Sequence, residues 1–109
     1  MLSVHPDIKY MRRCIELASK ANKKTGTNPK VGSVLVYQDR IIGEGYHIEY
    51  GKPHAEINAL ESVIISDKQY IPASTLYVSL EPCSHFGKTP PCAHRIVQEG
   101  IKNVVIGCP

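Results

Sequence analysis

Apolar residues near the N-terminus recur at intervals of three and four residues, the spacing of one face of a helix. This stripe consists of Ile8, Met11, Ile15 and Ala18. Asp7 after Pro6 is typical of a helix start, and Gly26 is expected to end the helix. The pattern therefore predicts a first helix that turns this stripe towards the core.

Two runs rich in β-branched and aromatic residues follow, over residues 31–37 and 41–46. They flank the polar segment Gln38-Asp39-Arg40, which is short enough to join two antiparallel strands. The sequence thus predicts a hairpin here.

The second half of the chain alternates between helical and strand patterns. Residues 54–65 predict an amphipathic helix with Ile57, Leu60 and Ile64 on its apolar face, followed by a polar stretch over 66–73. Strands are predicted over 75–80 and 103–107, and a helix over 92–99 with Gly100 as its C′ residue. A strand, helix and strand in this order form a parallel βαβ unit with a right-handed crossover. We therefore predict a mixed α/β sheet covered on both faces.

The last predicted strand looks buried, yet only Cys108 and Pro109 follow it. Nothing later in the chain could cover or pair its edge. We accordingly expect residues 1–109 to form a single domain whose fold is cut short after the fourth strand.

Length and composition narrow the class of protein. A chain of 109 residues with 42% hydrophobic and 21% charged residues fits one globular domain. Its longest apolar run, residues 34–37, is far below the roughly 20 residues that span a bilayer. No signal peptide is evident, so we expect no membrane association and a cytoplasmic location.

A net charge of +3 is too small to indicate nucleic-acid binding. The basic residues of the first helix are interpreted as a solvated face, with a phosphate-bearing partner as the alternative. They are Lys9, Arg12, Arg13, Lys20, Lys23 and Lys24.

The chain has four cysteines, which in a reducing compartment are better interpreted as metal ligands, catalytic groups or core residues than as disulfides. Cys14, on the first helix, is expected to be a core thiol. His5 and His94 are expected at the surface, and Cys108 is not expected to bind metal.

Four residues with chemical potential stand at the ends of predicted elements: His54, Glu56, Cys83 and Cys92. Strand C-termini and helix N-termini share one edge of an α/β sheet, so these residues could converge there. Two thiolates and one imidazole suit a zinc site that keeps its fourth position open. Zinc lowers the pKa of its bound water to about 7, and a nearby carboxylate such as Glu56 can carry the proton. Hydrolytic deamination needs this combination.

The same residues carry a resemblance to a known family. His54-Ala55-Glu56 followed by Pro82-Cys83 and a further cysteine resembles the zinc-dependent cytidine-deaminase-like enzymes. The usual signature ends in Pro-Cys-x-x-Cys, whereas here eight residues separate Cys83 from Cys92. This long form looks like the deaminase domain of riboflavin biosynthesis. The segments 28–32, 43–47 and 53–56 are similar to that family as well.

The resemblance implies a three-layer α/β/α fold and deamination of 2,5-diamino-6-ribosylamino-4(3H)-pyrimidinone 5′-phosphate at its 2-amino group. It implies zinc held by His54, Cys83 and Cys92, with Glu56 moving the proton. Substrate contacts would come from Asn28, His47, His85 and Lys88. It also implies a homo-oligomer and the possibility of a fused reductase domain.

Two other interpretations stay open. One is a deaminase for another base, such as a free nucleobase, a nucleotide or a tRNA adenosine. The other is a zinc-stabilised fragment without turnover.

Overall fold

The computed structural model describes residues 6–25, 31–46, 55–79 and 93–107. The helices are α1 (Pro6–Thr25), α2 (Ala55–Glu61) and α3 (Ala93–Gln98), with a 3₁₀ helix, η1 (Ile65–Ala73). The strands are β1 (Gly32–Tyr37), β2 (Arg40–Tyr46), β3 (Thr75–Ser79) and β4 (Asn103–Gly107). Among these elements, no helix has the length and apolar character needed to cross a bilayer.

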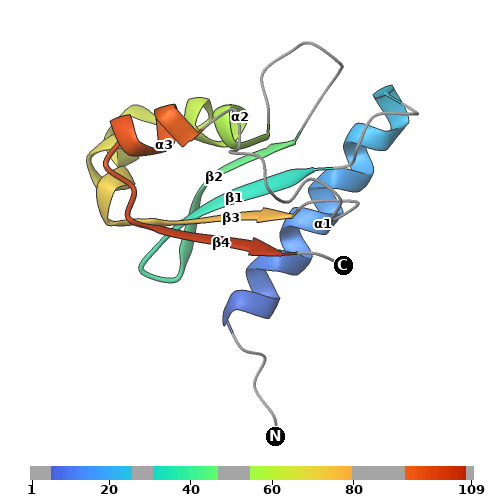
Figure 1. Cartoon of the computed structure of the whole chain (residues 1–109), viewed down its shortest axis with the longest axis horizontal. Helices are drawn as coiled ribbons and strands as arrows, with labels where there is room; N and C mark the ends of the chain where they lie inside the picture. Colours follow the sequence, from blue (N-terminus) through green and yellow to red (C-terminus); the bar gives the residue numbers. More distant parts are fainter. Residues whose placement is uncertain (1–5, 26–30, 47–54, 80–92, 108–109) are drawn as a thin grey trace, which may run out of the picture.

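The four strands form one sheet in the order β2-β1-β3-β4. Strand β1 is antiparallel to both of its neighbours, whereas β3 and β4 are parallel. Helix α1 covers one face of the sheet, and α2, α3 and η1 lie on the other (Figure 1). The predicted mixed sheet, with its hairpin, its βαβ unit and its helix layers, is confirmed.

The two faces of the sheet hold different cores. On the side of α2 and α3 the core is aliphatic, and Leu35, Leu60 and Leu76 lie near its centre. On the side of α1, Tyr10 and Tyr77 pack with Cys14, and their rings lie 5.2 Å apart. Each tyrosine hydroxyl has a carboxylate acceptor: Tyr10 donates to Asp39, and Tyr77 donates to Asp7 over 2.8 Å.

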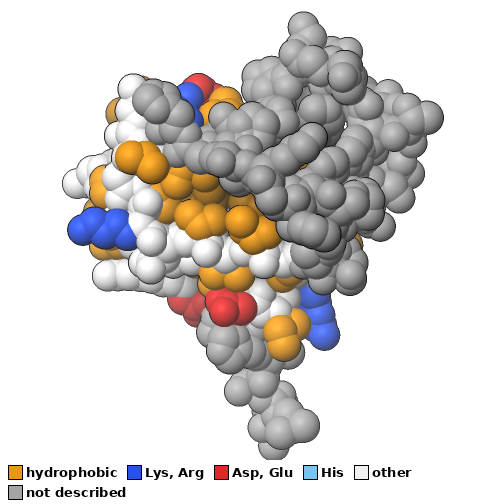
Figure 2. Space-filling view, viewed as in Figure 1, with side chains coloured by type: hydrophobic (Ala, Val, Ile, Leu, Met, Phe, Trp, Pro, Cys, Tyr) orange, Lys and Arg blue, Asp and Glu red, His pale blue; other side chains and the backbone are white. Residues whose placement is uncertain are grey.

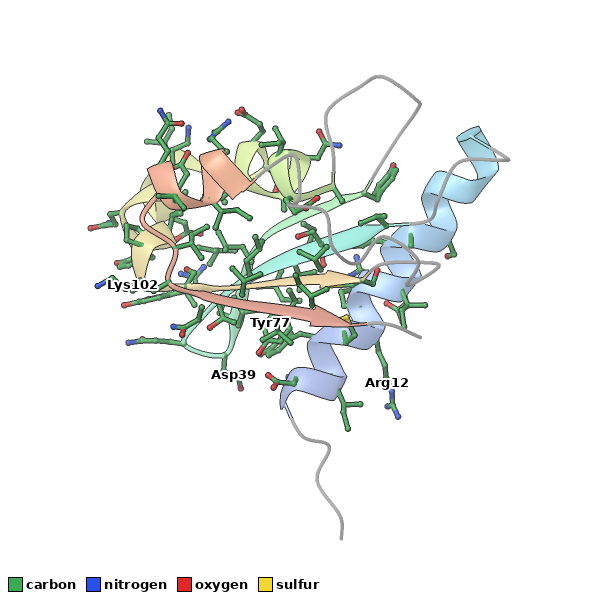
Figure 3. All side chains as sticks on the ribbon, viewed as in Figure 1. Arg12, Asp39, Tyr77 and Lys102 are labelled. Carbon is green, nitrogen blue, oxygen red and sulfur yellow. The ribbon has the colours of Figure 1, made fainter. Side chains whose placement is uncertain are left out.

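Helix α1 begins and ends within a residue of the prediction, but the predicted buried stripe is only half right: Ala18 is buried and Met11 packs against the core, whereas the two isoleucines are not buried. Ile8 and Ile15 are 51% and 44% exposed, while Tyr10, Cys14 and Leu17 are buried. This second set also has helical spacing. It faces the sheet because the Tyr10 hydroxyl finds a distant acceptor in Asp39, and because Gly32, which has no side chain, leaves room for the backbone carbonyl of Cys14. Of the basic residues, Lys9 and Arg12 are exposed, and Arg12 points away from the sheet (Figure 3).

The predicted hairpin is confirmed, with a two-residue turn instead of three. Gln38 and Asp39 both have positive φ, 46° and 61°, the backbone of the turn whose twist matches paired strands. The register slips once, between Leu35 and Val36, which forms a β-bulge.

Helix α2 is shorter than predicted. The Ser62 hydroxyl donates to the carbonyl oxygen of Ala59, and the Val63 amide bonds that of Leu60, so the last turn tightens. Ile64 is extended and exposed, contrary to its predicted place on the apolar face. The polar stretch that follows forms η1, in which Asp67 accepts two hydrogen bonds of 3.1 Å from Arg40.

Helix α3 ends at Gln98, one residue before the predicted end, and Gly100 is its C′ residue as predicted. Gly100 has a φ of +79°, and the Ile101 amide bonds the Ile96 carbonyl while the Gly100 amide bonds that of Val97. These two bonds make a Schellman motif.

Strand β4 stands at the edge of the sheet, where its predicted burial proves incomplete. Val104 and Ile106 are 40% and 51% exposed, although their cross-strand neighbours Leu76 and Val78 are buried. Figure 2 shows apolar side chains gathered in this area, between α3 and β4. Val104 and Ile106 thus extend the apolar face of the sheet that carries the aliphatic core.

Candidate active site

Strand ends that lie close in sequence to several predicted site residues meet at one end of the sheet. Gly32 pairs with Tyr46, and Ser79 pairs with Gly107. Because Ser33 pairs with Val78 in an antiparallel ladder, Gly32 lies opposite Ser79. These four residues therefore form a row across this end of the sheet. The row marks the start of β1 and the ends of β2, β3 and β4. These strand ends therefore share one end of the sheet, while the convergence of the predicted site residues there stays a prediction.

The structure describes one of the predicted site residues, Glu56. The others lie outside the described residues: Asn28, His47, His54, Cys83, His85, Lys88 and Cys92. In sequence they adjoin the row of strand ends or precede α2 and α3. The ligand set and the substrate contacts therefore stay predictions.

Glu56 lies in the first turn of α2 and is only 5% exposed. Ala55 and Ala59 beside it are fully buried. A carboxylate is seldom this buried, because its charged form loses water at a large cost in free energy. Retention of such a group next to a predicted metal ligand favours a chemical role over a structural one.

Helix α2 rests directly on the backbone of β2. A Cβ added at Gly45 would lie 2.5 Å from the Ala55 carbonyl oxygen, and one at Gly43 would lie 2.5 Å from that of Ala59. Strand β2 can therefore carry only glycine at these two positions. The contacts also give the direction of α2, whose first residue lies at the end of β2 and hence at the row of strand ends.

Asn58 of α2 and Ser62, which directly follows α2, bond the outer backbone groups of β2. Asn58 Nδ2 donates to the Tyr46 carbonyl oxygen over 2.7 Å, and the Glu44 amide donates to Ser62 Oγ over 2.9 Å. Asn58 and Ser62 are four residues apart, so they project from the same side of the helix. They occupy hydrogen-bonding groups that an edge strand would otherwise present to solvent.

Arg13 connects α1 to the same strand. Its Nε and Nη2 donate to the two carboxylate oxygens of Glu44 over 2.6 and 3.0 Å, and its Nη1 donates to Glu16 over 3.0 Å. The hydrogen bonds that Arg13 donates to Glu44 and Glu16 raise its pKa further above its usual value. Strand β2 is thus held from both faces of the sheet.

Two buried serines fasten the start of β1 to the end of β3. The Gly32 amide donates to Ser79 Oγ over 3.1 Å, and Ser33 Oγ donates to the Tyr77 carbonyl oxygen over 2.8 Å. Ser79 and Gly32 belong to the row of strand ends. These bonds fix the relative position of the points that precede Cys83 and follow Asn28 in sequence.

The donor chemistry fits zinc. His54, Cys83 and Cys92 offer one nitrogen and two sulfur atoms, the ligand types of catalytic zinc sites. Cys14 is no competitor: it is fully buried, its thiol points to the Tyr77 carbonyl oxygen at 3.5 Å, and burial raises its pKa to about 12. Its predicted place in the core is confirmed. Within residues 6–25, 31–46, 55–79 and 93–107, no three histidine, cysteine or acidic side chains gather as a metal site.

Sequence reasoning missed Asn58, Ser62 and Ser79. A signal for the first two was present: glycines two apart in a strand, beside a helix with Ala55 and Ala59 four apart, favour close backbone approach. Polar residues beside these alanines, such as Asn58 and Ser62, are then close enough to form hydrogen bonds with the strand. Ser79 carried no comparable signal.

Residues 4–108 match the family described as the cytidine and deoxycytidylate deaminase zinc-binding region. The family's description confirms zinc as the cofactor. The match spans nearly the whole chain.

Two relatives illustrate the similarity in sequence. The diaminohydroxyphosphoribosylamino-pyrimidine deaminase of Buchnera aphidicola from Schizaphis graminum is 52% identical over 97 residues, which are 89% of this chain and 63% of that protein. The chloroplastic riboflavin biosynthesis protein PYRD of maize is 48% identical over 101 residues, which are 93% of this chain and 25% of that protein. The chain thus spans from about a quarter to just under two thirds of these relatives.

Solved structures agree. The bifunctional diaminohydroxyphosphoribosylaminopyrimidine deaminase and uracil reductase of Thermotoga maritima is 48% identical, with a TM-score of 0.77 over 94% of this chain and 29% of that one. A cyanophage dCMP deaminase, at 23% identity and a TM-score of 0.68 over 96% of this chain and 84% of that one, shares the fold. With its fold, its strand-end row and the match over residues 4–108, the chain belongs to the zinc-binding cytidine and deoxycytidylate deaminase family.

Proposed function

We propose that this chain catalyses hydrolytic deamination of 2,5-diamino-6-ribosylamino-4(3H)-pyrimidinone 5′-phosphate in riboflavin biosynthesis. Water adds at C2 of the ring, the bond from C2 to the 2-amino nitrogen breaks, and ammonia leaves. The product is 5-amino-6-ribosylaminouracil 5′-phosphate. The reaction consumes one water molecule and needs no oxidant or reductant.

The observation that carries the proposal is the identity to dedicated deaminases. Two Buchnera proteins named as diaminohydroxyphosphoribosylamino-pyrimidine deaminases are 50% and 52% identical to this chain over 92% and 89% of its length. Proteins named for dCMP and guanine deamination are only 23% identical, and support the fold alone. The long spacing between Cys83 and Cys92 favours the same substrate.

Glu56 is the residue that moves the proton. Zinc held by His54, Cys83 and Cys92 supplies, when bound, a Lewis acid that lowers the pKa of water to about 7. Glu56 takes a proton from the attacking water and delivers it to the departing amine. Its burial in the first turn of α2 keeps bulk water from competing for that proton.

Four further residues are assigned to the substrate: Asn28, His47, His85 and Lys88. An amide and two imidazoles can hydrogen-bond the ring, and the lysine can pair with the phosphate. The row of strand ends supports this assignment, since Asn28 precedes β1, His47 directly follows β2, and the other two lie between β3 and α3.

The proposal extends to the setting of the enzyme. We place it in the cytoplasm, as a homo-oligomer whose natural partner is a small phosphorylated pyrimidine. A fused reductase domain is supported by relatives such as the Thermotoga protein, which is named for both activities.

Ammonia release tests the function. The zinc-loaded protein is incubated with the diaminopyrimidinone phosphate, cytidine, dCMP or guanine, and ammonia is measured. We expect turnover of the first compound at least 100-fold above that of the others. Turnover confined to cytidine, dCMP or guanine would assign that compound as the substrate instead. The absence of turnover with every compound would favour a fragment without catalysis.

Glu56→Gln tests the proton carrier. Since general acid–base groups contribute about 10²- to 10⁴-fold, kcat should fall by that factor while zinc content stays at one per chain. Glu61→Gln is the matched control: Glu61 is exposed on the same helix and pairs with Arg95 over 3.3 Å, so kcat should change less than twofold. Equal kcat for both variants would remove Glu56 from the mechanism.

A further inference from the structure

Asn58 joins the helix that carries Glu56 to the strand that precedes His47. Its Nδ2 donates to the Tyr46 carbonyl oxygen over 2.7 Å, in a partly buried setting. Asn58 is two residues beyond Glu56, and Tyr46 is the last residue of β2. One hydrogen bond therefore spans the two elements on which a proposed proton carrier and a proposed substrate contact are mounted.

The glycine contacts of α2 leave one freedom of movement. The backbones of Gly43 and Gly45 fix how closely α2 approaches β2, because the atoms already touch. A glycine surface has no side chains to interlock with a helix, so it offers little resistance to sliding along the strand. The packing of Leu60 in the aliphatic core and the hydrogen bonds to β2 therefore set the position of α2 along the strand.

We propose that Asn58 is a positioning residue that sets the place of Glu56 along β2, an inference that rests on the proposed function. The bond to Tyr46 lies at the end of β2 where the site is built. Without it, the first turn of α2 can shift while the rest of the helix stays packed. A displacement of about 1 Å at a reacting group can cost roughly 100-fold in rate.

Ser62 provides the internal comparison. It accepts a hydrogen bond from the Glu44 amide over 2.9 Å, on the same strand, but in the turn that follows α2 and further from the strand-end row. It also donates to the Ala59 carbonyl oxygen over 2.7 Å. Ser62 should therefore stabilise the fold without setting the position of the first turn.

The test compares Asn58→Ala, Asn58→Asp and Ser62→Ala. Aspartate keeps the shape of asparagine, but its ionised carboxylate cannot donate a hydrogen bond. Both Asn58 variants should lower kcat about ten- to 100-fold with KM changed less than threefold and zinc retained at one per chain. Ser62→Ala should lower the Tm by about as much as the Asn58 variants do, and should keep kcat within twofold of the wild-type value. Losses of kcat that follow Tm in all three variants, or an unchanged kcat in the Asn58 variants, would overturn the proposal.

Amide hydrogen exchange separates this inference from the proposed function. If the wild-type protein releases no ammonia, the proposed function fails, yet exchange still tests the positioning. Asn58→Ala should speed exchange at residues 55–59 at least tenfold, whereas Ser62→Ala should do so at Glu44. Equal exchange at residues 55–59 in the two variants would show that Asn58 has no special role.

Discussion

The sheet has one edge at β2, which lies under α2, and the other at β4, whose aliphatic side chains Val104 and Ile106 are exposed among the described residues. At β2 a bulge, two helix side chains and an arginine occupy the strand. At β4 the described part of the chain shows an unbroken register and no such side-chain bonds.

This difference shows how a small domain can hold a helix in place on an edge strand. Edge strands usually need protection from pairing with other chains, and a helix laid along the edge supplies it. Here the protecting helix is also the one that carries Glu56. The proposed proton carrier therefore lies on the helix that is bonded to the more constrained of the two described edges.

Replacing a glycine with alanine should give the largest difference in stability between the two edges. Gly45→Ala puts its Cβ against the backbone of α2, and should lower the free energy of unfolding by about 3 kcal/mol or more, because neither backbone can yield. Gly107→Ala, on β4, meets the flexible end of Met11 at 2.7 Å, and should cost less than about 1 kcal/mol.

Urea midpoints measure both glycine variants. Similar midpoints for Gly45→Ala and Gly107→Ala would contradict the backbone contact between α2 and β2. A loss confined to the first would support it.

The turn that joins β1 to β2 should make stability depend on alkaline pH. Burial first, and then the hydrogen bond and charge of Asp39, raise the pKa of Tyr10 to about 12 from 10.0. Because the folded-state pKa is the higher one, this stabilisation is complete below pH 10 and is lost as the pH rises towards 12. Figure 3 shows Asp39 on the same side of the sheet as Tyr77, where α1 lies.

Tyr10→Phe should cost about 1 to 2 kcal/mol at neutral pH and flatten the decline in stability above pH 10. Asp39→Asn keeps the turn backbone, since asparagine tolerates positive φ, and should weaken the decline without abolishing it. Chemical unfolding at pH 8, 10 and 11.5 measures these effects. Parallel curves for all three proteins would contradict the role of Tyr10.

Lysine at the β4 edge should have the smallest effect. Val104→Lys and Ile106→Lys should each change the free energy of unfolding by no more than about 0.5 kcal/mol, because both side chains are exposed. Ile42→Lys, at a buried position of β2, should abolish folding. A loss above about 2 kcal/mol at either β4 position would show that another surface covers β4 in solution.

Local patterns predicted much of this fold because they act within a few residues. Gly100 terminates α3 through a Schellman motif, and Gln38 and Asp39 form the hairpin turn. The buried stripe of α1 could not be chosen this way. Two stripes had helical spacing, and the choice depended on acceptors for Tyr10 and Tyr77 that lie 29 and 70 residues away.

The candidate site divides in the same manner. The place of Glu56 at a helix start and the shared end of the strands were predicted correctly, whereas the ligand set stays a prediction. They did not predict how α2 is held, because that depends on contact between two backbones and on Asn58 reaching Tyr46. The length of α2 was also misjudged, since Ser62 tightens its last turn.

The contact of α2 with Gly43 and Gly45 has a consequence for how such an enzyme can evolve. Where side chains separate two elements, successive substitutions can widen or narrow the gap in small steps. Here the gap is set by atomic radii, so no such series of steps exists. New substrate preferences of the proposed enzyme would have to arise in the segments joined to the strand ends, while the position on β2 of the helix that carries Glu56 stays constant.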